Sequence, residues 1–147
     1  MVRAHIPCIA FAICTSALVL AQSPAMTGKW ALEAPAASGV NDGGGEWSQS
    51  AQSGTFTLQQ SNTTIKGQWQ GRQPAPWAVA GELHGDHVEL QTEFREIPVT
   101  IDGEKTTQKL RWTFRGVLSG DNLTGNMSFD GGRRRGNEQA FTATRQR

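Results

Sequence analysis

Residues 86–120, DHVELQTEFREIPVTIDGEKTTQKLRWTFRGVLSG, decide the fold. Asp102-Gly103, near the middle, is a residue pair that accepts the positive φ angles of a tight hairpin turn. Apolar and polar residues alternate on both sides of this turn, which is typical of strands with one buried and one solvated face. The stretch therefore predicts one long β-hairpin.

The register of this hairpin follows from the positions of its apolar residues. Near the turn, the apolar residues of the first strand have odd numbers, whereas those farther away have even numbers, as in the second strand. One extra residue, a β-bulge around Glu96–Pro98, reconciles the two halves, and proline is tolerated at a bulge. Beyond the bulge the register predicts the buried pairs Phe94–Leu110, Leu90–Phe114 and Val88–Gly116, and the solvated pairs Glu93–Arg111 and Glu89–Arg115.

The N-terminal segment has the features of a secretory signal peptide. Arg3 precedes the apolar stretch Cys8–Leu20, and small residues end at Ala21. The apolar stretch is shorter than the ~20 residues that span a bilayer as a helix. We expect cleavage after Ala21 and a secreted or periplasmic location, with residues 22–147 forming a single domain without a transmembrane anchor. A buried helix or an uncleaved anchor is the alternative.

Composition excludes several classes of function. Both cysteines, Cys8 and Cys14, lie in the predicted signal peptide, so the mature chain has no disulfide, thiol nucleophile or thiolate metal site. Lys and Arg number 14 against 13 Asp and Glu, and Arg3 leaves with the signal peptide. A chain of balanced charge has no field that would draw it onto nucleic acid. We expect no cofactor, and an unknown small molecule or protein as the partner.

The remaining chain predicts strands joined by turns and loops, with no helical periodicity. The predicted strands are residues 28–33, 54–60, 63–70, 77–84, the two strands of the long hairpin, 122–129 and 139–145. This all-β pattern predicts an antiparallel up-and-down meander closed into a small barrel of about eight strands, since closure removes exposed edges. An open sandwich is the alternative.

Loop lengths separate the two ends of such a barrel. One end, which we call the closed end, has the tight turns at 61–62, 85–86 and 119–121. The other, which we call the open end, has a flexible loop at 35–53, the loops 71–76 and 130–138, and the hairpin tip. Long loops on a rigid scaffold often carry binding sites. The candidate ligand-binding residues at the open end are Trp47, Phe56, Trp69, Trp77, Phe94, Leu110, Arg133, Arg134 and Arg135. The glycines before Trp47 suggest that it acts as a mobile cover.

The first and last strands resemble those of the calycin superfamily, which includes avidins, lipocalins and fatty-acid-binding proteins. Such barrels begin with Gly-x-Trp, here Gly28 to Trp30, and end with a basic residue that packs across the tryptophan, here Arg145. The resemblance implies an eight-stranded barrel in which these positions are structural. It does not imply biotin binding, because Ala31 and Leu32 stand where avidins have asparagine and serine. The chain also resembles exported bacterial proteins of unknown function that end in Phe-Thr-x-Thr-Arg.

Other patterns favour ordinary surface roles. His84 and His87 flank a tight turn with no third ligand nearby in sequence, so we expect no metal there. Asn62, Asn122 and Asn126 match the N-glycosylation pattern but suit ordinary turn and strand positions.

Three classes of function remain. The first is a binding module for a small apolar or aromatic ligand at the open end. The second is a filled barrel that acts as a protein-binding, inhibitor or envelope component. The third, less favoured, is an enzyme, which needs at least two titratable groups facing one cavity; Glu104 is the one candidate that we nominate near the open end. An empty barrel interior would favour the first class and a packed interior the second.

Overall fold

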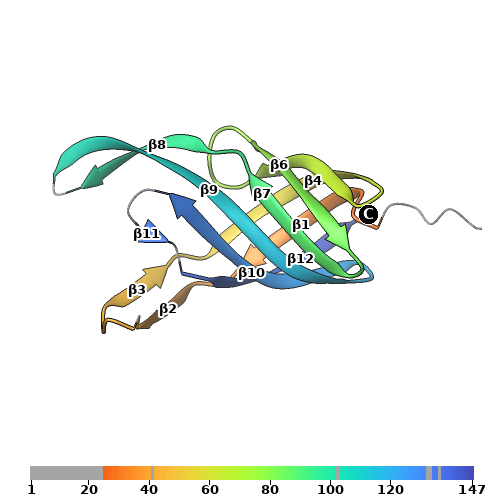
Figure 1. The fold of residues 1–147 in the computed structure, drawn as a ribbon, viewed down its shortest axis with the longest axis horizontal. Helices are drawn as coiled ribbons and strands as arrows, with labels where there is room; N and C mark the ends of the chain where they lie inside the picture. The colour runs from red at the N-terminus through yellow and green to blue at the C-terminus, as the bar shows by residue number, and fades with distance from the viewer. Residues whose placement is uncertain (1–24, 41, 102, 132–133, 136) are drawn as a thin grey trace, which may run out of the picture.

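The computed structural model describes residues 25–147 except 41, 102, 132, 133 and 136, and no side chain of Val99, Ile101, Arg134 or Arg135. The predicted signal peptide therefore lies outside the described residues. All regular elements that the structure describes are β-strands, as the alternating sequence pattern predicts (Figure 1). Among these residues no helix is long and apolar enough to cross a membrane.

Twelve strands are described, and eight of them form a closed antiparallel barrel. Their bounds are β1 Gly28–Ala34, β2 Ala37–Val40, β3 Glu46–Gln49, β4 Gln52–Ser61, β5 Thr64–Gln70, β6 Trp77–His84, β7 His87–Thr92, β8 Arg95–Ile101, β9 Glu104–Ser119, β10 Asn122–Gly131, β11 Arg134–Arg135 and β12 Gln139–Gln146. The barrel runs β1-β4-β5-β6-β7-β9-β10-β12, and β12 pairs with β1 to close it. The predicted all-β meander and its closure are confirmed.

The long hairpin has the predicted register in its barrel half. Val88 lies opposite Gly116, Glu89 opposite Arg115, and Leu90 opposite Phe114. β8 pairs with the outer half of β9 in a register shifted by one residue, so one extra residue separates the two halves. The inferred bulge exists.

The predicted position of the bulge is wrong. It lies at residues 93–94, between β7 and β8, and not around Glu96–Pro98. The Thr92 hydroxyl accepts a hydrogen bond from the Trp112 backbone N–H at 2.8 Å, and the Glu93 N–H donates to the Ala78 carbonyl at 2.9 Å. These bonds draw the chain out of the ladder with β9, so Arg95 lies opposite Leu110, where we expected Phe94.

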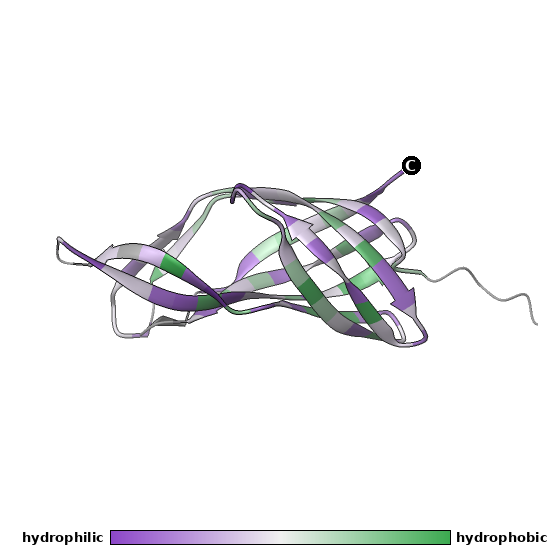
Figure 2. Ribbon diagram, turned by 90° about the horizontal axis from the view of Figure 1, so that it is seen from above, coloured by the Kyte–Doolittle hydropathy of each residue, from purple (hydrophilic) through white to green (hydrophobic). Residues whose placement is uncertain are grey.

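Inward-facing side chains fill the barrel from end to end. Trp30, Phe56, Leu90 and Met127 each have 0 % of their surface exposed, and Phe114 has 1 %. Figure 2 shows hydrophobic and hydrophilic positions alternating along the barrel strands. Successive side chains of a strand point alternately inward and outward, and paired residues on neighbouring strands point to the same side. Each strand therefore contributes one face to this core. The packed core spans the barrel, so the wall is held rigidly in place.

Two inward glycines allow the wall to coil tightly. A Cβ on Gly81 would lie 1.9 Å from the Glu89 carbonyl oxygen, and one on Gly125 would lie 1.9 Å from that of Arg115. No side chain fits at such distances, so the backbones of adjacent strands approach each other only because these residues are glycine. Close approach of this kind is what strongly bent barrel strands need.

Three segments project from one end of the barrel, opposite the C-terminus (Figure 1). They are the β8–β9 arm, formed by β8 and the paired part of β9; the β2–β3 hairpin; and the short β10–β11 pair. The expectation of an irregular loop over 35–53 missed the hairpin. Its alanine, serine and glycine residues give no apolar alternation, yet Trp47 and Gly39 are paired across it.

Candidate functional site

Four of the nine predicted binding residues belong to the packed core or lie against it. Phe56, Trp69 and Trp77 are exposed by 0, 1 and 3 %, and Leu110 is partly buried against the same cluster. The Phe114 ring lies edge-on to Phe56 and Trp69, with centroid distances of 5.0 and 5.2 Å. Phe56, Trp69 and Phe114 are therefore in mutual ring contact, and Trp77 is buried in the same cluster.

Trp47 lies on the β2–β3 hairpin and packs across it. It is half-buried opposite Gly39, where an added Cβ would lie 2.8 Å from the indole Nε1. The absence of a side chain at Gly39 therefore makes room for the ring. Trp47 stabilises its own hairpin in this structure, and its role as a mobile cover stays a prediction.

Phe94 faces outward, contrary to the expectation that it lines the barrel floor. Its exposed fraction is 53 %, and the guanidinium carbon of Arg111 lies 4.6 Å from its ring centroid. The bulge at 93–94 is the cause, since one extra residue reverses the face on which the next side chain lies. The expected Glu93–Arg111 pair is likewise absent: Arg111 pairs with Asp130 and Glu93 pairs with Arg95.

Arg95 fastens the loop 71–76 to the barrel. Its guanidinium donates to the carbonyls of Ala75 and Pro76 and to the carboxylate of Glu93, and its guanidinium carbon lies 5.0 Å from the centroid of Trp77. The hydrogen bond from Arg95, and then that from the Ala78 backbone, lower the pKa of Glu93 below its usual value. Sequence reasoning missed this cluster because it depends on where the bulge lies.

Arg145 forms a similar cluster at the closed end. Its guanidinium carbon lies 4.4 Å from the centroid of Trp30, and it donates to Asp121 at 2.9 Å and to the carbonyls of Ala25 and Thr27. The pKa of Asp121 is lowered, first by its hydrogen bond with Arg147 and then by that with Arg145. The expected packing of the last-strand arginine across the first-strand tryptophan is therefore observed.

The arginine run is only partly described. Arg133 lies outside the described residues, while Arg134 and Arg135 form β11, opposite Gly131 and Asp130. The direction of their side chains is not defined, so their proposed contact with an anion stays a prediction.

The histidines contact neighbouring carboxylates at the closed end. His84 Nε2 lies 2.7 Å from Glu82, and His87 Nδ1 lies 2.6 Å from Asp86. In the described part of the chain, no three His, Cys, Asp or Glu side chains are placed to hold a metal ion. The buried polar residues described are Thr92, Thr113 and Gln139, none of which is ionisable, and Glu104 is exposed on the β8–β9 arm.

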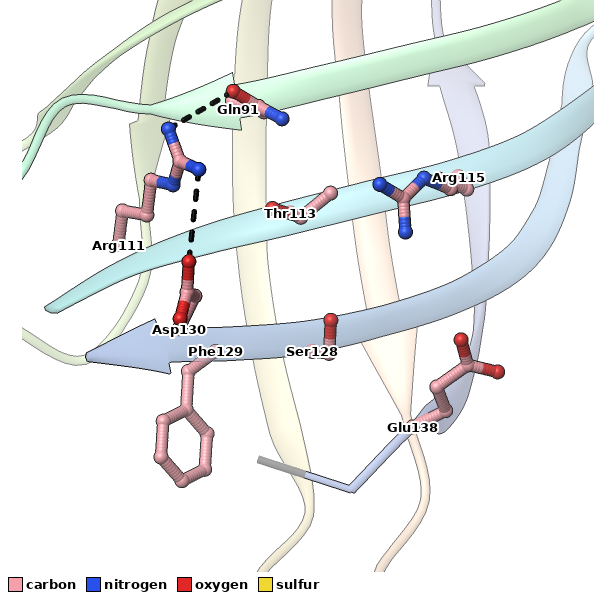
Figure 3. A pocket seen from close by; sticks show the side chains of 8 residues that line it. All are labelled: Gln91, Arg111, Thr113, Arg115, Ser128, Phe129, Asp130 and Glu138. Atoms are coloured by element: carbon pink, nitrogen blue, oxygen red, sulfur yellow. Dashed lines mark hydrogen bonds and ion pairs between the residues drawn. The ribbon is translucent and has the colours of Figure 1, made fainter. Parts of the chain in front are cut away.

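A hollow lies on the outer wall of the barrel, over β7, β9 and β10 (Figure 3). Its volume is about 280 Å³. The lining residues are Gln91, Arg111, Thr113, Arg115, Ser128, Phe129, Asp130 and Glu138. In Figure 3 Arg111 reaches Gln91 on one side and Asp130 on the other, whereas Phe129 points away from the polar side chains. We call this feature the outer-wall hollow.

The outer-wall hollow arises from the strand register. Gln91, Thr113 and Ser128 are paired in a row across the three strands. Arg115 lies in the row on one side of it and Arg111 in the row on the other. Two short hydroxyl side chains thus lie between two long cationic ones, which leaves a depression. The hairpin register inferred from the sequence pairs Gln91 with Thr113, but it does not extend to Ser128 on β10.

A second, shallower hollow of about 620 Å³ lies over β5, β6 and β7. It follows Ala80 and Gly81, with Glu82 and Glu89 at its sides. Glu82 and Glu89 are directly opposite each other across the two strands. Like charges in that position repel, so this surface contributes little to stability.

No protein-family model, curated protein or solved structure that was compared with the chain matches it.

Proposed function

We propose that this protein is an exported binding module in which a filled barrel is the scaffold and the open end contacts a partner protein. The signal-peptide pattern over residues 1–21 supports export. The eight-stranded closed barrel, together with Arg145 over Trp30, supports a relationship to the calycin-like barrels.

The filled interior is the observation that carries this proposal. Aromatic rings touch from Phe56 through Phe114 to Phe141, with Phe114 and Phe141 centroids 5.8 Å apart. A ligand inside the barrel would have to displace rings that are packed at the density of a protein core. A barrel with a filled interior would therefore bind its partner through its outer surface.

The open end offers apolar groups for such a contact. Phe94 is 53 % exposed beside the β8–β9 arm, and Val40 is 66 % exposed on the β2–β3 hairpin. Arg111 supports the Phe94 ring from below, so the ring loses little freedom when a partner covers it. Aromatic residues beside arginine are common anchors of protein interfaces.

Site-specific photo-crosslinking in the producing cell tests the proposal. A benzophenone side chain at position 94 should give an adduct of defined mass, which the purified partner should reproduce. The same group at Val117, which is 41 % exposed on the barrel half of β9, is the matched control. Equal adducts at both positions, or none at position 94, would contradict a contact at the open end.

A small ligand at the mouth of the barrel is the second candidate. The Nε1 atoms of Trp69 and Trp77 and the Oε1 atom of Gln139 are buried without a hydrogen-bond partner among the described residues. Buried polar groups are nearly always satisfied, so these atoms favour a polar ligand that enters under the loops. Tryptophan fluorescence with aromatic acids, fatty acids and sugars tests this. A response that Trp47→Ala weakens would support it, and no response would leave the protein partner as the better proposal.

A further inference from the structure

The outer-wall hollow adjoins the open end through Arg111, but its floor has its own chemistry. Its floor is formed by Thr113, only 7 % exposed although it faces outward, and by half-buried Ser128. The hydroxyl of each residue is able to donate and to accept a hydrogen bond. Arginine donors and carboxylate acceptors surround this floor. The hollow therefore presents both kinds of hydrogen-bonding group within one small volume.

The polar side chains around the hollow make long contacts with one another. Arg111 lies 3.2 Å from Gln91 and 3.6 Å from Asp130. Arg115 lies 3.3 Å from Glu89, and Asn126 lies 3.4 Å from Glu138. Strong charge-assisted hydrogen bonds are shorter, at about 2.7–2.9 Å. Arg111 Nε is also buried with no partner among the described residues.

The same barrel makes short arginine contacts elsewhere. Arg95 lies 2.6 Å from Glu93, and Arg145 lies 2.9 Å from Asp121. The contacts around the hollow are therefore longer than those of the clusters at the two ends, and Arg111 Nε is the buried donor there without a partner among the described residues.

The balance of charge indicates the class of ligand. Arg111 and Arg115 face the carboxylates of Glu89, Asp130 and Glu138 around the hollow. A phosphate or another compact anion would be attracted by the arginines and repelled by the carboxylates. A neutral ligand rich in hydroxyl groups satisfies both, because each hydroxyl accepts from an arginine and donates to a carboxylate. The volume, about 280 Å³, is near the lower limit for small-molecule sites.

We propose that the outer-wall hollow binds one saccharide unit. The floor hydroxyls of Thr113 and Ser128 hydrogen-bond to the sugar, while Arg111 and Arg115 donate to its oxygens and Asp130 and Glu138 accept from its hydroxyls. This site is built from the outward face of β7, β9 and β10 together with Glu138, and it adjoins the proposed protein contact because Arg111 also lies against Phe94.

Direct binding measurements on the purified protein test this site. The probes are a glycan array, followed by calorimetric titration with N-acetylglucosamine, glucose, galactose, mannose and their disaccharides, and with phosphate and acetate for comparison. We expect binding of at least one saccharide and none of either anion. No saccharide binding, or phosphate binding in its place, would overturn the proposal.

Three variants locate the binding. Ser128→Phe fills the hollow and should abolish saccharide binding, and Thr113→Val should weaken it about tenfold by removing one hydroxyl while keeping the shape. Thr57→Val changes an exposed threonine on β4, across the barrel, and should bind as the wild type does. The melting temperature of each variant shows that it is folded. If saccharide binding survives Ser128→Phe in a folded protein, the hollow is not the site.

Discussion

The guanidinium carbon of Arg95 lies 5.0 Å from the ring centroid of Trp77, and this contact fastens the open end of the barrel. Arg145 and Trp30 repeat the arrangement at the closed end. In each case the guanidinium also donates hydrogen bonds to backbone carbonyls and to one carboxylate. The carboxylate is that of Glu93 in the first cluster and that of Asp121 in the second. One cluster holds the loop 71–76, and the other holds residues 25–27 around the buried side chain of Met26.

Replacing Arg95 with methionine should free the loop 71–76. The change keeps an apolar stem over Trp77 but removes hydrogen bonds to Ala75 and Pro76, and we expect a loss of about 1–2 kcal/mol in the free energy of unfolding. Faster amide hydrogen exchange should be confined to residues 71–76. Arg115→Met is the control, since its exposed pair with Glu89 contributes below about 1 kcal/mol. Equal losses in both variants would show that the loop contacts add nothing.

Trp30→Ala should destabilise the protein by about 3–5 kcal/mol, because it leaves a large cavity in a core position that is fully buried. Chemical denaturation followed by circular dichroism measures the loss. A change below about 1 kcal/mol would be incompatible with the burial of Trp30 at the barrel seam.

Phe94→Ala tests the position of the bulge. Because the ring is exposed, we expect a change in unfolding free energy within about 0.5 kcal/mol. Leu90→Ala, four residues earlier on the buried face, should cost about 2–5 kcal/mol. Costs of similar size at the two positions would place Phe94 in the core and the bulge elsewhere.

Stability should fall as the pH is lowered through the range in which Glu93 and Asp121 take up protons. Both pKa values are lowered in the folded protein, so the unfolded chain binds protons at a higher pH than the folded one. Their contribution is complete above the unfolded pKa, roughly 4, and is lost as the pH falls through the folded values.

Melting temperatures measured as a function of pH test this dependence. The acid-induced decrease should be smaller in Glu93→Gln and in Asp121→Asn, and smallest in the double variant. A double variant that keeps the wild-type dependence would assign the effect to other carboxyl groups.

The sequence was sufficient to predict the barrel because its buried strands alternate without ambiguity. Val88, Leu90, Phe114 and Leu118 fix the register of β7 and β9, and Glu89 opposite Arg115 agrees with it. The bulge was predicted too close to the hairpin tip because proline is tolerated at a bulge and Pro98 lies there. The hydrogen bonds at the observed bulge involve Thr92 and a β6 carbonyl, and no local sequence pattern reveals them.

The candidate sites were harder to predict than the fold. Phe56, Trp69 and Trp77, which were predicted to bind a ligand at the open end, belong to the core, because a residue's type does not say whether a cavity surrounds it. The outer-wall hollow depends on three strands being side by side, so its floor residues, Thr113 and Ser128, are inconspicuous when read along the chain.

The pairing of β1 with β12 also has a consequence for folding kinetics. The other barrel strands pair with neighbours that follow closely along the chain, whereas Trp30 meets Arg145 only after almost the whole domain has been ordered. Closing so long a loop is entropically costly, and contacts of this separation form slowly. Until that step, β1 and β12 would be open edges on which a second chain could assemble. The Arg145 cluster therefore stabilises the β1–β12 pairing. Because this pairing forms late in folding, the barrel is exposed to aggregation until it forms.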